Sequence, residues 1–381
     1  MIKVLFLSAW YPNRYDAMAG LFVRKHAEAV SRFCEVNVLY VHADKNIKHF
    51  DIINNSVHKI TETIIYYPSG NFFFKHMNYL IAYYKGFKWL RKNEFYPDIL
   101  HANVLTRTVF MALCYKILTR TPYVISEHWS RYLPARNGYR GLVRKLITRL
   151  VVKKSSAVLP VSISLKNAMI QNKLQHSNYH IIHNVVDDFF YTKYEKKSGS
   201  KKRFLHISCF DERAKNIKGI LRATKYLSDL RGDFELIMIG TGIDYNEIYQ
   251  YYTTLQFPLN RVQFLGEKTP AEVAQWLAQS DCFVLFSNYE TAGVVIAESL
   301  ACGRPVISTK VGIAEEFINN ASGIIVENGN EKALTEAMNR VLDQLDSYDE
   351  NIIKRNASSF TYQDVGEKIL NIYQKILHNN H

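Results

Sequence analysis

The stretch SNYETAGVVIAESLACGRPVISTKVG, residues 287 to 312, is the part of the sequence that decides the fold. It follows the apolar run CFVLFS (282 to 287), which predicts a buried strand, and it contains VVIAESLACG (294 to 303), which predicts a helix. Glu290 then lies in the loop between strand and helix, and Glu298 lies about two turns into the helix. This layout is typical of a ligand site beyond the carboxyl end of a strand in an open α/β sheet.

The start of the predicted helix also favours an anion. The main-chain amides of Thr291, Ala292, Gly293 and Val294 would lie where a helix N-terminus attracts phosphate. The alternative for the two acids is a pair of solvated glutamates that flank an ordinary core helix. Other segments of the chain favour the ligand site.

The same stretch resembles the E-x7-E signature of the retaining GT4-type glycosyltransferases, and the similarity extends over nearly the whole chain. The resemblance implies the α/β architecture of that family, the GT-B fold. In that fold two Rossmann-like, doubly wound domains face a central cleft.

The length of 381 residues favours two domains. We expect an N-terminal acceptor-side domain over 1–192 and a nucleotide-sugar-binding domain over 203–361. The segment KYEKKSGSKK, residues 193–202, is charged and rich in Ser and Lys, which is typical of a linker. The resemblance implies that the C-terminal helix, 362–381, packs back on the first domain.

Strand and helix patterns alternate in both halves. In the first half we expect strands at 3–8, 35–41, 97–104 and 121–127, a helix at 20–33, and an N-cap at Ser162 or Ser164, and at the end of the chain we expect an amphipathic helix at 361–377. In the second half we expect strands at 203–210, 234–240 and 261–267, and helices at 216–230 and 269–281, the last with Thr269, Pro270 and Glu272 as start signals.

Two residues of the first half are candidate site residues. Gly20 ends the loop after the first strand, directly before a helix, so the backbone can approach a ligand there. His128 matches the histidine of the family's T-x-H segment, and the resemblance implies that it lies beside the transferred sugar. His101 also follows a strand, and we interpret it as a structural hydrogen-bonding residue. Asn184 and Asp187 match the family segment that closes the first domain.

Lys215 matches the family lysine that binds the donor diphosphate. The family arginine six residues earlier is replaced by Cys209, so Arg213 is a candidate substitute and Lys218 a weaker one; solvated helix-start charges are the alternative. The resemblance assigns Glu290 to the sugar hydroxyls and Glu298 to the ribose.

The resemblance, carried by these residues, implies a retaining glycosyltransferase that transfers a hexosyl or N-acetylhexosaminyl group from a nucleotide-diphosphate sugar to a lipid-linked or surface glycan. The catalytic set is His128, Glu290 and Lys215. The donor-binding set is Gly20, Arg213, Lys215, Thr291, Ala292, Gly293, Val294 and Glu298. We expect no cofactor and no metal, because the sequence has no D-x-D triplet and because cations and a helix dipole can bear the diphosphate charge.

Other enzyme classes have weaker support. The segment GTGID (240–244) contains the first two glycines of the dinucleotide-binding motif G-x-G-x-x-G, but Tyr245 stands where the third glycine would be. The sequence therefore does not match that motif. A GT-B-type nucleotide-sugar epimerase, a glycan phosphorylase and a non-catalytic glycan- or nucleotide-binding relative remain as alternatives.

Charge is unevenly distributed. Residues 1–195 contain 27 Lys and Arg against 12 Asp and Glu, whereas 196–381 contain 21 against 23. Two basic, acid-free segments, 72–92 and 136–154, interleave apolar or aromatic residues with Lys and Arg. Such segments suit an anionic membrane surface; a core helix with a solvated basic face is the alternative. No nucleic-acid-binding module is recognisable.

The five cysteines are scattered and include no CxxC, which favours reduced thiols. VLFLSAW (4–10) predicts a strand and not a signal peptide. We therefore expect a cytoplasmic protein, peripheral on the inner face of the cell membrane.

Overall fold

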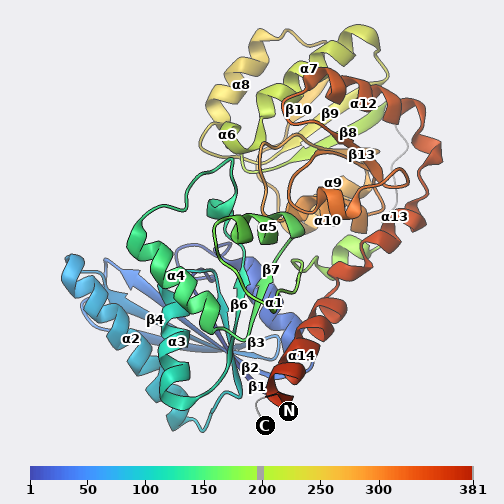
Figure 1. Ribbon diagram of the computed structural model, residues 1–381. Helices are drawn as coiled ribbons and strands as arrows, with labels where there is room; N and C mark the ends of the chain where they lie inside the picture. Colours follow the sequence, from blue (N-terminus) through green and yellow to red (C-terminus); the bar gives the residue numbers. More distant parts are fainter. Residues whose placement is uncertain (195–200, 380–381) are drawn as a thin grey trace. The chain divides into compact units, whose positions relative to one another are not determined.

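The computed structural model describes residues 1–194 and 201–379, and it divides into two compact units (Figure 1). Unit 1 comprises Met1–Tyr132, Asn137–Val185 and the segment from Tyr362 onward, and unit 2 comprises Leu133–Arg136 and Val186–Thr361. Each unit is an α/β sheet structure, so the predicted fold class is confirmed.

The boundary between the units falls earlier than the predicted end at residue 192. Phe190 is buried in the core of unit 2, and the Val186 amide donates to the Phe360 carbonyl at 2.9 Å. Most of the predicted linker, residues 195–200, lies outside the described residues, and Lys202 already belongs to a strand.

Unit 1 contains a seven-stranded sheet in the order β3-β4-β2-β1-β5-β6-β7. All pairs are parallel except β3–β4. The central strands are continuous apolar runs, because helices cover both faces of a parallel sheet. The strands are β1 (Lys3–Ser8), β2 (Glu35–Asp44), β3 (Asp51–Val57), β4 (Ile60–Pro68), β5 (Ile99–Asn103), β6 (Tyr123–Glu127) and β7 (Ala157–Pro160).

The helices of unit 1 form two layers. In Figure 1, α2, α3 and α4 lie together on one side of the sheet, and α1 and α14 lie side by side on the other. Ser162 caps α5 by accepting from the Leu165 amide at 3.1 Å, which confirms the predicted N-cap. The helices are α1 (Leu21–Ser31), α2 (Phe72–Lys92), α3 (Arg107–Thr119), α4 (Leu142–Lys154), α5 (Ile163–Gln171) and α14 (Tyr362–His378), with a 3-10 turn η1 (Ser130–Tyr132).

Unit 2 contains a six-stranded, fully parallel sheet in the order β10-β9-β8-β11-β12-β13. The strand order reverses between β8 and β11, and ligands of open α/β sheets bind at such a point. The strands are β8 (Lys202–Ile207), β9 (Phe234–Ile239), β10 (Val262–Phe264), β11 (Cys282–Leu285), β12 (Val306–Thr309) and β13 (Gly323–Val326).

The helices of unit 2 cover both faces of its sheet, and each face has its own apolar core. The predicted start of α9 is confirmed, because Thr269 and Glu272 form a capping box with Pro270 in the first turn. The helices are α6 (Glu212–Lys215), α7 (Ile217–Leu230), α8 (Tyr245–Thr254), α9 (Pro270–Ala278), α10 (Val294–Ala301), α11 (Ala314–Phe317), α12 (Glu331–Asp343) and α13 (Glu350–Asn356), with 3-10 turns η2 (Asp188–Tyr191), η3 (Leu345–Ser347) and η4 (Ser358–Phe360).

Candidate active site

An ion pair between Lys215 and Glu290 lies at the centre of the predicted site in unit 2. Lys215 ends α6, Glu290 lies in the loop before α10, and Lys215 Nζ is 2.5 Å from Glu290 Oε1. The two side chains are only 14% and 13% exposed. Burial by itself lowers the pKa of Lys215, but the Glu290 carboxylate reverses the effect and the net shift is upward. The ammonium ion is therefore held charged at the edge of the sheet.

Two loops meet to bring this pair together. One follows β8 and the other follows β11, which are neighbouring strands at the point where the strand order reverses. The Asn288 amide donates to the Ala214 carbonyl at 2.8 Å, and Asn288 Nδ2 donates to the Arg213 carbonyl at 3.0 Å. These bonds fix the Glu290 loop against the end of α6.

Ser287 holds Glu290 from within its own loop, and sequence reasoning missed it. The buried Ser287 hydroxyl donates to Glu290 Oε1 at 2.8 Å. The Ser287 carbonyl in turn accepts from Thr309 Oγ1 at 2.6 Å, so the loop is fastened to the end of β12. The only sequence signal was its position three residues before Glu290.

The start of α10 is shaped by glycine. Gly293 caps the helix in the left-handed region, with φ 70°, which a residue with a side chain rarely adopts. The Ala292 carbonyl accepts from the Ile313 amide at 2.9 Å, and a Cβ on Gly312 would lie 2.3 Å from the same carbonyl oxygen. The segment Thr291–Val294 is thus held at a helix N-terminus, next to the Glu290 loop.

The remaining candidates of unit 2 differ in their exposure to solvent. Glu298 lies half-buried within α10, and Arg213 has an exposed side chain. Cys209, at the place of the family arginine, is exposed on the loop after β8. Lys218 pairs with Glu247 at 2.5 Å, which favours a structural role for that lysine.

In unit 1, Gly20 begins α1 with a φ of 62°. A Cβ there would lie 2.1 Å from the carbonyl oxygen of Trp10, so the close backbone approach that requires glycine is made within the loop itself. The loop after β1 folds back on its own start. Whether Gly20 also approaches a donor stays a prediction.

His128 follows β6 and is almost fully buried. Its ring packs against Phe22 of α1 at 4.2 Å between centroids, and His26 lies 5.3 Å away. Burial lowers the pKa of His128 well below its usual range, and the neighbouring His26 and His101 lower it further. The imidazole is therefore neutral at physiological pH.

His101 has the structural role that we inferred from the sequence. One ring nitrogen is 2.5 Å from the Tyr373 hydroxyl and the other is 2.6 Å from the Ser126 hydroxyl. Both ring nitrogens are thus engaged in the core of unit 1.

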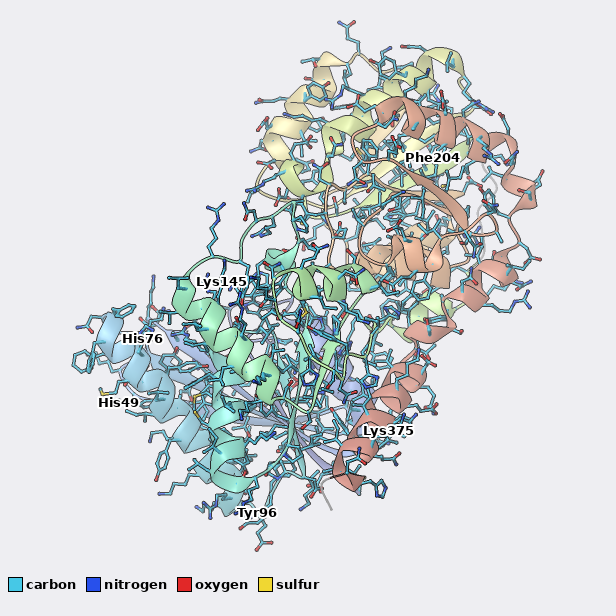
Figure 2. The ribbon with its side chains drawn as sticks, in the orientation of Figure 1. His49, His76, Tyr96, Lys145, Phe204 and Lys375 are labelled. Carbon is cyan, nitrogen blue, oxygen red and sulfur yellow. The ribbon has the colours of Figure 1, made fainter. Side chains whose placement is uncertain are left out.

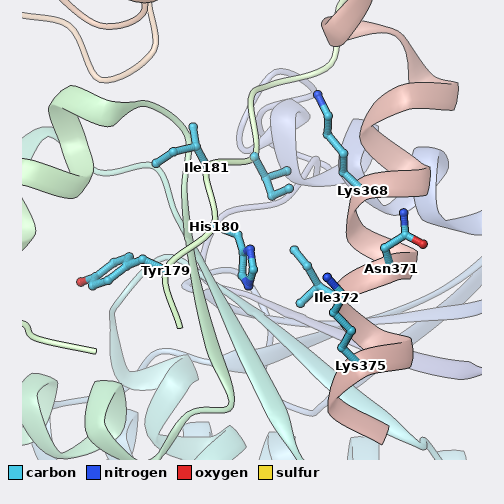
Figure 3. Close-up of a pocket in the computed structure, with 8 residues that line it drawn as sticks. Tyr179, His180, Ile181, Lys368, Asn371, Ile372 and Lys375 are labelled. Atoms are coloured by element: carbon cyan, nitrogen blue, oxygen red, sulfur yellow. The ribbon is translucent and has the colours of Figure 1, made fainter. Parts of the chain in front are cut away.

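A separate pocket of about 370 Å³ lies in unit 1 between α14 and the segment after α5 (Figure 3). Its lining includes His180, Lys368 and Lys375 and none of the predicted site residues. Among residues 1–194 and 201–379, no three His, Cys, Asp or Glu side chains gather in a way that could hold a metal ion. Within the same residues, no helix is both long and apolar enough to cross a membrane.

Comparison with known families agrees with this geometry. The model of "Glycosyltransferase Family 4" matches residues 21–188, and that of "Glycosyl transferases group 1" matches residues 189–358. Together they span both units. The chain belongs to the GT4-type glycosyltransferases, and the activity of this class is sugar transfer.

Individual relatives are more distant. The chain is 29% identical over 240 residues to an N-acetyl-alpha-D-glucosaminyl L-malate synthase of Bacillus anthracis, in an alignment that covers 60% of this chain and 61% of that relative. It is 26% identical to a Campylobacter jejuni N-acetylgalactosaminyltransferase named for a diphospho-undecaprenol-linked acceptor, with 67% and 71% covered.

Solved structures share the fold. A sucrose-phosphate synthase from Thermosynechococcus elongatus superposes with a TM-score of 0.76 at 17% identity, over the whole of both chains. The Anabaena protein HepE in complex with UDP and glucose has a TM-score of 0.72 at 19% identity, over 98% of this chain and 100% of that one. The predicted GT-B fold is confirmed.

Proposed function

We propose that the protein is a retaining, metal-independent glycosyltransferase that moves a hexosyl or N-acetylhexosaminyl group from a nucleotide-diphosphate sugar to a lipid-linked or surface-glycan hydroxyl. The observation that carries the proposal is the Lys215–Glu290 pair beside the start of α10. An ammonium ion and a helix N-terminus supply positive charge for a diphosphate, and a carboxylate supplies acceptors for sugar hydroxyls.

The pair can serve both purposes at once. Lys215 has three N–H donors and Glu290 has about four acceptor positions. After their mutual hydrogen bond and the bond from Ser287 are formed, each group can still form further hydrogen bonds. A bound donor would share them, with phosphate on Lys215 and hydroxyls on Glu290. The contact keeps both groups in place before the donor arrives.

The other predicted residues complete this assignment. Thr291, Ala292, Gly293 and Val294 would present main-chain amides to the diphosphate, and Glu298 would accept from the ribose hydroxyls. In unit 1, neutral His128 would contact the transferred sugar and Gly20 would lie near the diphosphate. Arg213 would be a mobile cation recruited from its exposed position.

A same-face displacement fits these groups best. The bond from the anomeric carbon to the phosphate oxygen breaks as the bond to the acceptor oxygen forms on the same face. The departing phosphate oxygen takes the acceptor's proton. Lys215 and the α10 amides would stabilise the negative charge that grows on the leaving diphosphate.

The acceptor side favours an anionic membrane. Helices α2, α3 and α4 carry twelve Lys or Arg and no Asp or Glu. Their exposed apolar side chains are large, with Phe72 80% and Leu142 81% exposed. Others on the same helices are Phe73, Phe74, Met77, Leu80, Tyr84, Phe110, Ile117, Leu118, Val143, Leu146, Ile147 and Leu150.

These three helices lie side by side on one layer of unit 1 (Figure 1); His76 of α2 and Lys145 of α4 are labelled in Figure 2. Apolar area interleaved with cations is the composition that binds an anionic lipid surface. We propose that the protein works in the cytoplasm, peripherally on the inner face of the cell membrane, where lipid-linked acceptors are accessible. The name of the Campylobacter relative supports such an acceptor.

The test combines donor binding with turnover. UDP, GDP, ADP and their sugars are screened by thermal shift, and the stabilising donor is then incubated with a membrane extract that contains acceptors. Glu290→Gln should lower turnover by about 100-fold or more while the protein stays folded. Lys215→Ala should abolish the thermal shift given by the nucleotide diphosphate, and EDTA should leave turnover unchanged.

Two results would contradict the proposal. Equal, slow turnover by the wild type and Glu290→Gln would favour a non-catalytic relative, which the replacement of the family arginine by Cys209 allows. A donor converted to its epimer without any acceptor would instead favour the nucleotide-sugar epimerase.

A further inference from the structure

Glu127 is a buried acid in unit 1 to which the reaction proposed above gives no task. It is the last residue of β6, and its side chain is fully buried. A buried carboxylate is costly unless hydrogen bonds compensate it. The hydrogen-bond partners of Glu127 therefore indicate its role.

Three main-chain amides satisfy this carboxylate. Oε1 accepts from the amides of His128 and Trp129, both at 2.8 Å, and Oε2 accepts from the Leu105 amide at 2.8 Å. Two different loops are thereby joined at the carboxyl edge of the sheet. One follows β6 and carries His128, and the other follows β5.

The second loop is itself constrained. Val104 has a φ of 67°, a conformation that β-branched residues rarely adopt, and its amide donates to the Ser126 carbonyl at 2.8 Å. Leu105, whose amide donates to Glu127, is the next residue after Val104. Such a backbone persists only where surrounding contacts hold it.

We propose that Glu127 is a positioning residue, which sets His128 for sugar transfer by fastening the His128, Trp129 and Leu105 amides to one buried carboxylate. The inference rests on the role proposed for His128. The His128 ring lies against Phe22, and the Trp129 ring is covered by the Arg131 guanidinium at 3.0 Å. A shift of the main chain at 128 and 129 would displace both rings.

The ionised form of Glu127 fits this arrangement. A carboxylate offers acceptors to all three amides, whereas a protonated carboxyl group presents an O–H to one of them. Burial raises the pKa of Glu127 to about 7, although the three amides and Arg131 lower it. The other titratable groups that face Glu127 are Tyr132 in η1 and Tyr179 after α5, beside His128 itself.

The first test is kinetic. Glu127→Ala should lower kcat about 100-fold, as expected for a misplacement of ~1 Å, with the KM for donor changed little. Glu127→Gln should lie between this variant and the wild type, because its oxygen can still accept from His128 and Trp129 while its NH2 faces the Leu105 amide. In the wild type kcat should rise as pH increases through about 7, and Glu127→Gln should lack that rise.

Glu62→Gln is the matched control. Glu62 is also a buried acid of unit 1, on β4, but its partners are side chains: it accepts from the Tyr11 hydroxyl at 2.6 Å and forms an ion pair with Arg24 at 3.3 Å. The Glu62→Gln variant should be less stable than the wild type but should keep the pH dependence of kcat. If Glu127→Ala retains the wild-type kcat, or if Glu62→Gln also loses the rise with pH, Glu127 is not a positioning residue.

The second test uses the unaltered protein, so it does not depend on variants that fold. Hydrogen exchange, corrected for the intrinsic pH dependence, should show the Leu105, His128 and Trp129 amides protected at pH 8 and less protected at pH 6. Unchanged protection would overturn the proposal. Because this measurement needs no donor or acceptor, it stays decisive even if the wild type transfers no sugar.

Discussion

At the level of single residues, the Ser287 hydroxyl is the contact that fixes the orientation of the Glu290 carboxylate. The Ser287 hydroxyl and the Lys215 ammonium group both donate to the same oxygen, Glu290 Oε1. In the function proposed above, the second carboxylate oxygen would accept from a sugar hydroxyl. Removal of the Ser287 hydroxyl should therefore disturb the orientation of the Glu290 carboxylate.

We therefore predict that Ser287→Ala lowers kcat/KM for the donor about 10-fold. A hydrogen bond to a charged group is worth about 1.5–3 kcal/mol, and about 1.4 kcal/mol corresponds to a tenfold change. Steady-state kinetics with varied donor measures the effect. Ser308→Ala is the control, because Ser308 is equally buried and its hydroxyl donates to the Thr309 carbonyl at 3.0 Å and not to Glu290. Equal losses in both variants would contradict the role of Ser287.

The sequence led to Lys215 and Glu290 because both stand in motifs that resemble the family. It did not lead to Ser287 or Glu127, because their roles depend on loop conformations. Ser287 is placed by Thr309, from a different strand, and Glu127 is placed by amides of two loops. Such contacts have no fixed spacing along a chain, so no pattern of residue types predicts them.

At the level of elements, the strands were the most predictable part. The strand predicted at 3–8 matches β1, because a central parallel strand is a continuous apolar run. We did not assign β3, whose sequence DIINNSV is polar and whose residues are mostly exposed or half-buried at the sheet edge. Helix α3 was also missed as part of the basic surface, because it contributes only two of the cations.

We predict that the surface formed by α2, α3 and α4 retains the protein on anionic liposomes at low salt. Charge reversal at Arg140, Arg144 and Lys145 should release it, since each near-surface cation contributes about 1 kcal/mol. Replacement of Leu142 and Leu146 by Ser should weaken the binding that survives high salt, because apolar insertion is not screened. Co-sedimentation with phosphatidylserine vesicles measures both effects.

The control for this prediction has the same change in net charge. Lys202, Lys332 and Arg355 are exposed residues of unit 2, and their replacement by Glu should leave liposome binding unaltered. If this variant is released as readily as the variant with Arg140, Arg144 and Lys145 reversed, net charge alone explains the binding. If liposomes fail to retain the wild type, the prediction that α2, α3 and α4 form a membrane-binding surface is wrong.

At the level of the whole molecule, the chain closes unit 1 with its last helix. Six side chains of α14 are buried in the core that also contains β1 and α1, namely Tyr362, Val365, Ile369, Ile372, Tyr373 and Ile376. Gly366 lets the helices approach, since a Cβ there would lie 2.4 Å from the Ala29 carbonyl oxygen. Unit 1 therefore cannot complete its core until the chain has passed through unit 2.

This order of assembly predicts that removal of residues 362–381 unfolds unit 1 and leaves unit 2 folded. Burial of six side chains contributes about 1.5–3 kcal/mol each, and the sum is comparable to the whole stability of a domain, about 5–15 kcal/mol. Limited proteolysis should then degrade 1–185 and spare a fragment near 186–361. Removal of 379–381 alone should change nothing, because the buried positions of α14 end at Ile376. A truncated chain as protease-resistant as the full one would mean that α14 only covers a core that β1 and α1 already stabilise.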